Sequence, residues 1–84
     1  MSIIVRKVTE EEKRYMEQKE VWESEIAQFD YKYENDETCV IEKGSAEIMC
    51  GNQKVILSEG DLAYFPKGTV CMWKVLSPMR KYLR

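Results

Sequence analysis

The 84-residue sequence has no histidine, only two prolines, and three cysteines without a C-x-x-C pair. The missing histidine removes the commonest metal ligand among side chains and the commonest general base of enzymes. Cys39, Cys50 and Cys71 are an odd number at irregular spacing, which favours reduced thiols in a reducing compartment over a disulfide framework. We therefore expect all three cysteines to be free and to fill the core.

Long apolar runs are also missing from the sequence. No segment approaches the ~20 apolar residues that a membrane helix requires. Only three consecutive apolar residues precede Arg6, which is fewer than the ~7–15 of a secretory signal. We expect a cytoplasmic protein with no membrane partner.

The charges are divided unevenly between the two halves of the chain. Residues 1–42 carry six basic and twelve acidic side chains, whereas residues 43–84 carry seven and three. A nucleic-acid surface requires clustered Lys and Arg with interleaved aromatic residues, so no nucleic-acid partner is expected. Oppositely charged halves favour attraction within or between subunits. Because so short a chain buries only about two-thirds of its unfolded surface, we expect a homodimer.

One helix is predicted near the start of the chain. Thr9 and Glu12 have the spacing of a capping box, in which each side chain accepts a hydrogen bond from the backbone N–H of the other residue. Acidic side chains at 10–12 favour the positive end of a helix. We predict a surface helix over 9–20.

Elsewhere the dominant sequence period is two. Over 27–34, apolar or aromatic side chains at odd positions alternate with polar ones, which indicates a strand with one buried face. Gly51 and Asn52 suit a two-residue type II′ hairpin, because glycine accepts the positive φ at the first central position. Such runs, eight in all, predict an all-β barrel or sandwich. They cover 3–8, 27–34, 37–43, 45–50, 53–58, 61–65, 69–76 and 79–84.

Two sets of spaced residues resemble the conserved motifs of the cupins. Gly60, Pro66, Gly68 and Cys71 follow the second motif, G-x5-P-x-G-x2-H-x3-N, with Cys71 at the histidine position and Val75 at the asparagine. The resemblance covers residues 22–84.

Glu37 and Gly44 match the end of the first cupin motif, H-x-H-x3-E-x6-G, and Tyr31 and Tyr33 then stand at its two histidine positions. The chain resembles the short single-domain cupins grouped with ureidoglycine aminohydrolase and the ethanolamine-utilisation Q protein. This resemblance implies an all-β, cupin-type jelly-roll barrel with one short N-terminal helix. The barrel and the helix would form a single domain over 1–84, with the cupin motifs within 31–44 and 60–75.

The resemblance also implies a metal site, which in cupins takes three imidazoles and one carboxylate. The matched positions here hold Tyr31, Tyr33, Glu37 and Cys71. A neutral tyrosine is a poor ligand because its phenol must lose a proton of pKa near 10. Glu37 and Cys71 alone are fewer than the three or four protein ligands of a usual zinc site. We expect no metal and no cofactor.

The candidate ligand-binding residues are Tyr31, Tyr33, Glu37, Cys71 and Trp73, which strand parity places inside the barrel. Burial among aromatic rings raises the pKa of a carboxyl group, which is the condition for a general acid or base near neutral pH. Glu37 is the candidate catalytic residue, or else a structural hydrogen-bond hub. Cys71 is a core filler unless a base activates it, and Trp73 is either packing or a stacking wall.

The basic residues near the C-terminal end are open to two interpretations. Arg80, Lys81 and Arg84 could attract an anionic ligand, but such charges are more often a solvated sheet edge that discourages aggregation.

Three functions remain in competition. The first is a metal-free cupin that binds a small polar metabolite in the barrel. The second is a proton-transfer enzyme, aminohydrolase-like or isomerase-like, that uses Glu37. The third is a structural or regulatory dimer whose pocket is packed shut by Trp73 and Met72. Family likeness is analogy and does not decide among them.

Overall fold

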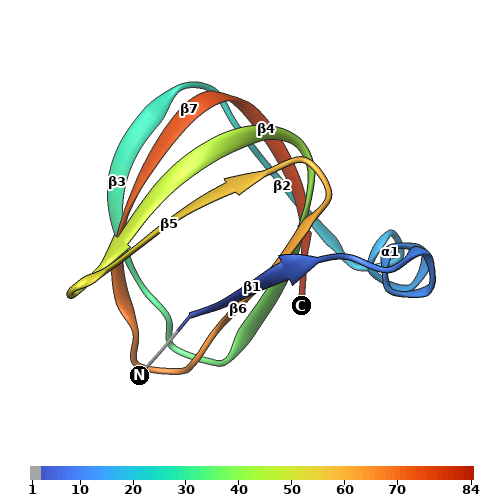
Figure 1. Cartoon of the computed structure of the whole chain (residues 1–84), viewed down its shortest axis with the longest axis horizontal. Helices are drawn as coiled ribbons and strands as arrows, with labels where there is room; N and C mark the ends of the chain where they lie inside the picture. The colour runs from blue at the N-terminus through green and yellow to red at the C-terminus, as the bar shows by residue number, and fades with distance from the viewer. Residues whose placement is uncertain (1–2) are drawn as a thin grey trace.

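The computed structural model describes residues 3–84, which form one helix and seven strands (Figure 1). In chain order these elements are β1 (Ile4–Lys7), α1 (Glu10–Met16), β2 (Glu20–Ser24), β3 (Ala27–Lys32), β4 (Glu37–Cys50), β5 (Gln53–Ser58), β6 (Asp61–Phe65) and β7 (Val70–Leu83).

Two long strands, β4 and β7, organise the sheet. The first part of β4 lies between β6 and the last part of β7. β1 pairs with the free side of β6 and β2 with that of β7, so the strand order here is β1-β6-β4-β7-β2. The last part of β4 lies between β5 and the first part of β7, and that part of β7 also pairs with β3. All these pairs are antiparallel, and Figure 1 shows the strands curving around one interior, in agreement with the expected jelly-roll barrel.

Both long strands continue through positions where the sequence predicts breaks. The pairing of β4 with β7 changes register between Ile41 and Ala46, so irregularities turn the strands without ending them. Gly44 lies in this bend with φ of +89°, where a Cβ atom would overlap the backbone of Pro78 and Met79. The predicted pairs of strands at 37–43 and 45–50, and at 69–76 and 79–84, are therefore wrong as separate elements.

The helix is shorter than predicted, and a strand follows it. The capping box is confirmed, because the Glu12 N–H donates to Thr9 Oγ1 at 3.1 Å and the Thr9 N–H donates to Glu12 Oε1 at 3.0 Å. The helix ends at Met16, whose buried side chain joins a small cluster with Val40, Leu62 and Tyr82. The prediction that the helix continues to residue 20 is wrong, because the chain turns to pair β2 with β7.

The remaining strands agree closely with the sequence pattern. The strands at 53–58 and 61–65 have the predicted bounds, and the run over 27–34 forms a strand that ends at Lys32. Gly51 has φ of +59° while Asn52 does not have a positive φ, so the hairpin between Cys50 and Gln53 has the φ signs of type II′.

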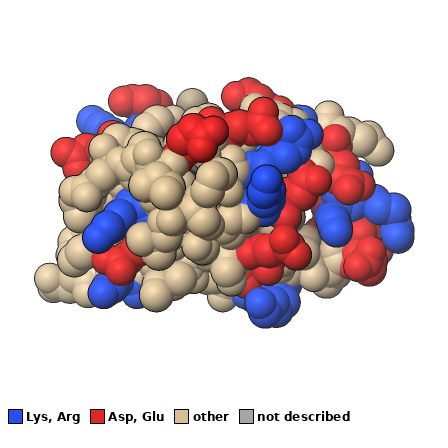
Figure 2. Space-filling view, turned by 90° about the horizontal axis from the view of Figure 1, so that it is seen from above, with Lys and Arg blue, Asp and Glu red and all other residues tan. Residues whose placement is uncertain are grey.

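The inward side chains of both sheet halves form one core. Three aromatic rings lie at its centre, from Tyr33, Phe65 and Trp73, each at most 2% exposed. Figure 2 looks onto the outer side of the barrel, where acidic and basic groups are intermixed and gather toward the end that carries α1. Within residues 3–84, no helix is long and apolar enough to cross a membrane.

Candidate functional site

A pocket of about 160 Å³ opens between β2, β3 and the adjoining parts of β4 and β7. It brings together four of the five predicted site residues, Tyr31, Tyr33, Glu37 and Trp73. The other lining residues are Glu20, Trp22, Phe29, Lys81 and Leu83.

A buried lysine is the main polar group of this pocket. Lys81 is 5% exposed, and its ammonium nitrogen lies 4.1 Å from the ring centre of Trp73 and 4.7 Å from that of Trp22. Ring faces attract a cation, and more strongly where water is excluded. The carboxylate of Glu37 lies 3.7 Å from the same nitrogen, which is longer than a hydrogen bond. The ammonium therefore lies against ring faces and lines the pocket.

The interpretation of Lys81 as part of a solvated edge is wrong. Its side chain points inward because the odd positions of β7 keep one face through the whole strand, from Cys71 and Trp73 to Met79 and Lys81. This parity was visible in the sequence. It was obscured by the predicted separation of the runs 69–76 and 79–84, which placed Lys81 on a different strand from Trp73.

Glu37, at the first position of β4, is half-buried beside Lys81. Burial raises the pKa of its carboxyl group, because the charged form loses hydration. The ammonium of Lys81 opposes this shift and Glu20 adds to it, so that the pKa remains above that of an exposed glutamate. The carboxyl group can therefore exchange a proton closer to neutral pH than an ordinary glutamate.

Aromatic rings form the apolar wall of the pocket, and the ammonium of Lys81 lies against two of them. Phe29 and Trp73 are stacked, with ring centres 6.3 Å apart and an angle of 4° between the planes. Trp22 leans against both rings, at 6.0 Å from Phe29 and 6.3 Å from Trp73. Trp22 and Glu20 lie on β2, a strand that the sequence pattern does not predict, so neither is among the predicted lining residues.

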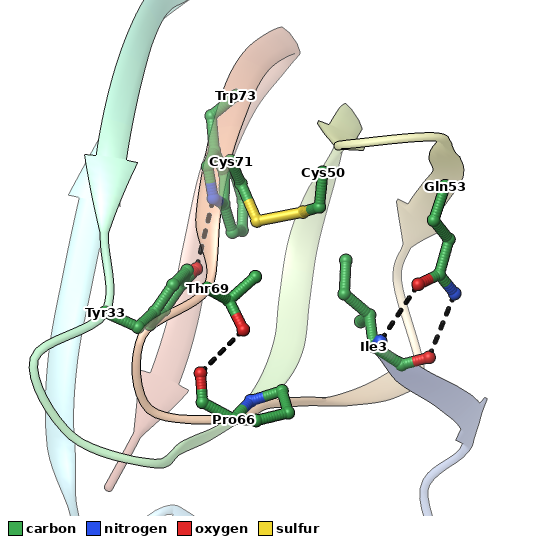
Figure 3. Close-up of a disulfide and its surroundings, with 8 residues drawn as sticks. All are labelled: Ile3, Tyr33, Cys50, Gln53, Pro66, Thr69, Cys71 and Trp73. Carbon is green, nitrogen blue, oxygen red and sulfur yellow. Dashed lines mark hydrogen bonds between the residues drawn. A yellow bond between two sulfur atoms is a disulfide. The ribbon is translucent and has the colours of Figure 1, made fainter. Parts of the chain in front are cut away.

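The two tyrosines have different positions. Tyr33 is buried, and its hydroxyl accepts a hydrogen bond of 3.1 Å from the indole N–H of Trp73 (Figure 3). Burial raises the pKa of this phenol above its ordinary value of 10.0, so the hydroxyl group stays protonated. Tyr31 is 45% exposed at the rim and meets Tyr33 edge to face. A second cavity of about 180 Å³ shares Tyr31, Tyr33 and Glu37 with the first and extends to Arg84.

Cys71 is bonded to Cys50 in a disulfide (Figure 3). Met49 of β4 lies opposite Met72 of β7, so the next residues, Cys50 and Cys71, also face each other, with Cα atoms 4.3 Å apart. The prediction of three reduced thiols is therefore wrong for two of them, since strand register is not visible in cysteine spacing. Cys39 is the one free cysteine of residues 3–84, and burial raises its pKa to about 11.

The donor set does not fit the transition-metal site that the cupin resemblance implies. The sulfur of Cys71 is bonded to another sulfur and cannot act as a thiolate ligand. Tyr33 keeps its proton, and the ammonium of Lys81 beside Glu37 repels a cation. In the described part of the chain, no three His, Cys, Asp or Glu side chains are grouped to hold a metal ion.

Several solved structures are similar to this one, among them the following three. A DUF861 family protein from Thermotoga maritima is 37% identical, with a TM-score of 0.93, and the match covers 99% of this chain and 98% of that one. The EutQ protein of Clostridium difficile is 28% identical, with a TM-score of 0.68, over 75% of this chain and 51% of its own. A DUF1255 protein of unknown function from Acidithiobacillus ferrooxidans is 20% identical, with a TM-score of 0.71, over 74% and 60%, which shows the fold alone.

No curated protein sequence gives a significant match. Residues 11–82 match the family described as the EutQ-like cupin domain, which is most of the chain. The match includes the strands that build the pocket, from β2 to nearly the end of β7. The chain belongs to the EutQ-like cupin family.

Proposed function

We propose that this protein binds a small polar metabolite in the pocket between β2, β3, β4 and β7, without a transition metal. The observation that carries this proposal is Lys81. A lysine is seldom fully buried unless its charge is paired. Here the charge faces a cavity, and within residues 3–84 a single carboxylate, that of Glu37, lies in ion-pair range, 3.7 Å away.

The lining suits recognition of a polar molecule. Lys81 provides hydrogen-bond donors, Glu37 provides an acceptor, and the rings of Trp22, Phe29 and Trp73 provide flat apolar surface. Such a mixture of apolar walls with a few convergent polar groups is typical of small-molecule sites. The volume of about 160 Å³ is below the ~300–1,000 Å³ of pockets for drug-sized ligands, so the ligand is small.

The open pocket disfavours the alternative of a barrel packed shut. Trp73 forms one wall and leaves the cavity free. Met72 lies on the opposite side of β7, where its sulfur accepts a hydrogen bond from the Gln28 side chain. Neither side chain plugs the cavity in the way that a vestigial pocket would require.

The test is a thermal-shift screen of amines, ureides, sugar acids and small carbonyl compounds on the wild type, Glu37→Gln and Lys81→Met. A ligand at a hundredfold excess over its dissociation constant adds about 2.7 kcal/mol to the free energy of unfolding. We expect the shift in the wild type and in Lys74→Met, whose lysine is exposed on the outer face, and a reduced shift in the two pocket variants. A broad panel in which no compound shifts the wild type would refute the proposal.

Proton transfer by Glu37 is the second candidate function, because its raised pKa favours it. The carboxyl group would move a proton to or from the bound metabolite, as a general acid or base does in many enzymes. Turnover assays on any ligand found by the screen test this. The candidate requires that Glu37→Gln lower the turnover number at saturating ligand, and an unchanged turnover number would remove Glu37 from the chemistry.

A further inference from the structure

We infer that Lys81 is a covalent binding site for a carbonyl compound, and that its side-chain amine forms a reversible imine with a small aldehyde or ketone inside the pocket. The inference rests on the proposed function, because the carbonyl compound must first enter the same cavity. It goes further by naming the reacting atom and the chemical class of the ligand.

Lys81 is the nucleophile that the pocket offers. Among the described lining residues it carries the one amine, and Cys71, an inward cysteine of the same strand, has its sulfur in the disulfide. The Lys81 side chain points into the barrel, and only 5% of the residue is exposed. A carbonyl carbon that enters the cavity is therefore brought to this nitrogen and shielded from bulk water.

Glu37 is placed to move the protons that imine formation requires. It takes one proton from the ammonium of Lys81, 3.7 Å away, which leaves a neutral amine with a free electron pair. That pair forms the C–N bond with the carbonyl carbon, and a proton passes from nitrogen to oxygen to give a carbinolamine. The Glu37 carboxylic acid then protonates the hydroxyl group, which leaves as water, and the C=N double bond forms.

The reaction is balanced within the site. One carbonyl compound and one ammonium give one protonated imine and one water, Glu37 ends as the carboxylate it was at the start, and no oxidant or reductant takes part. The raised pKa of Glu37 supports its two roles, since a carboxyl group that exchanges protons closer to neutral pH than an ordinary glutamate is better able to act as base and then as acid.

The product keeps the electrostatic contacts of the free lysine. A protonated imine carries the same positive charge at the same nitrogen, between the ring faces of Trp22 and Trp73 and beside the carboxylate of Glu37. The contacts that stabilise the ammonium therefore stabilise the product also. The low exposure of the nitrogen limits the water that would hydrolyse the imine.

The experiment traps the imine on the folded protein. Wild-type protein is incubated separately with glyoxylate, pyruvate and propanal, the imine is reduced with sodium cyanoborohydride, and the modified lysines are quantified by peptide mass spectrometry. Lys74, exposed on the outer face of the same strand, is the internal control. Because the pocket holds the reactants together, we expect Lys81 to be modified at least roughly tenfold faster than Lys74 with one or more probes.

Two comparisons separate a built site from ordinary lysine reactivity. In urea the difference between Lys81 and Lys74 is expected to disappear, and in folded Glu37→Gln the rate at Lys81 is expected to fall while that at Lys74 is unchanged. Modification of Lys81 no faster than Lys74 with all three probes would overturn the inference. If a probe raises the melting temperature yet leaves Lys81 unmodified, the proposed binding stands and imine formation is refuted.

Discussion

The indole nitrogen of Trp73 donates a hydrogen bond to the hydroxyl oxygen of Tyr33, 3.1 Å away, in the interior of the barrel. Both side chains are almost fully buried, and the ring of Tyr33 is stacked on Phe65 with ring centres 4.5 Å apart. Trp73 is also the wall of the pocket and the ring nearest the ammonium of Lys81. The hydrogen bond therefore fixes a group that positions the lysine.

Tyr33→Phe is expected to destabilise the protein, because it leaves the indole N–H of Trp73 buried without its acceptor. An unsatisfied buried donor costs about 1–3 kcal/mol of unfolding free energy, measured here by urea denaturation. Tyr31→Phe is the control, since its side chain is half exposed at the rim. Equal losses of unfolding free energy in the two variants would show that the hydrogen bond from Trp73 to Tyr33 does not stabilise the protein measurably.

The Cys50–Cys71 disulfide is expected to stabilise the barrel. It closes a segment with a sequence separation of 21, and a loop of that order restricts the unfolded chain by about 3 kcal/mol. Adding a reductant should lower the denaturation midpoint of the wild type. The double variant Cys50→Ala, Cys71→Ala should be less stable and indifferent to reductant. Detection of three free thiols in the purified, unreduced protein would contradict the structure on this point.

The features that were predicted correctly depend on residues near one another in sequence. The capping box needs only Thr9 and Glu12, and the hairpin needs only Gly51 between two alternating runs. Strand parity, a local period of two, placed Tyr33 and Trp73 inside the barrel. The spacing of the motif residues identified the family, because the motif glycines and proline stand at turns and bends whose positions along the chain are set by the barrel.

The features that were missed depend on register between distant strands. Nothing in the spacing of Cys50 and Cys71 shows that they lie opposite each other, since that follows from the pairing of β4 with β7. Trp22 belongs to a strand with a weak apolar pattern that pairs only with the end of β7. Lys81 was assigned by its charge, because a buried lysine is rare, although its parity pointed inward.

Gly44→Ala is expected to be more damaging than Gly60→Ala. Both glycines have φ near +90°, so alanine is strained at either position, which costs of the order of 1–3 kcal/mol. At Gly44 the added Cβ would also overlap the backbone of Pro78 and Met79, whereas at Gly60 no atom of the described residues beyond its two chain neighbours lies within 4 Å of it. Urea denaturation of the two variants isolates this contact, and equal losses would show that the bend opens to admit a methyl group.

A homodimer remains our prediction for the protein in solution. Ile56 is 59% exposed on β5, a strand at the edge of its half of the sheet, and Val70 is equally exposed at the start of β7. Light scattering at micromolar concentration should give a mass near twice the 10.0 kDa of one chain. Ile56→Lys, on the exposed edge strand, should shift the mass toward that of the monomer if sheet edges pair. A wild-type mass near that of one chain would refute the prediction.

The stability of the protein should carry a pH dependence that comes from Glu37. Its pKa in the folded protein is raised, chiefly by burial, so the folded state holds the proton more tightly than the unfolded state. The stabilising contribution is then fully present below the unfolded pKa of about 4.5 and is lost as pH rises through the folded pKa. The unfolding free energy of the wild type minus that of Glu37→Gln should therefore fall as pH rises through this window.

Glu12→Gln is the matched control, because the contribution of Glu12 to the unfolding free energy changes with pH in the opposite direction to that of Glu37. The side-chain hydrogen bond from Arg6 is the largest cause that lowers the pKa of Glu12, to about 2. The contribution of Glu12 is therefore present above its unfolded pKa and is lost as pH falls.

Removing the ammonium in Lys81→Met should raise the pKa of Glu37 further and move its window to higher pH, since Lys81 lowers that pKa. A difference between wild type and Glu37→Gln that stays flat with pH would mean that Glu37 is solvated in the folded protein. A difference that rises with pH would mean that the ammonium of Lys81 outweighs burial and lowers the pKa of Glu37. Either result would remove the physical basis of the proton-transfer role.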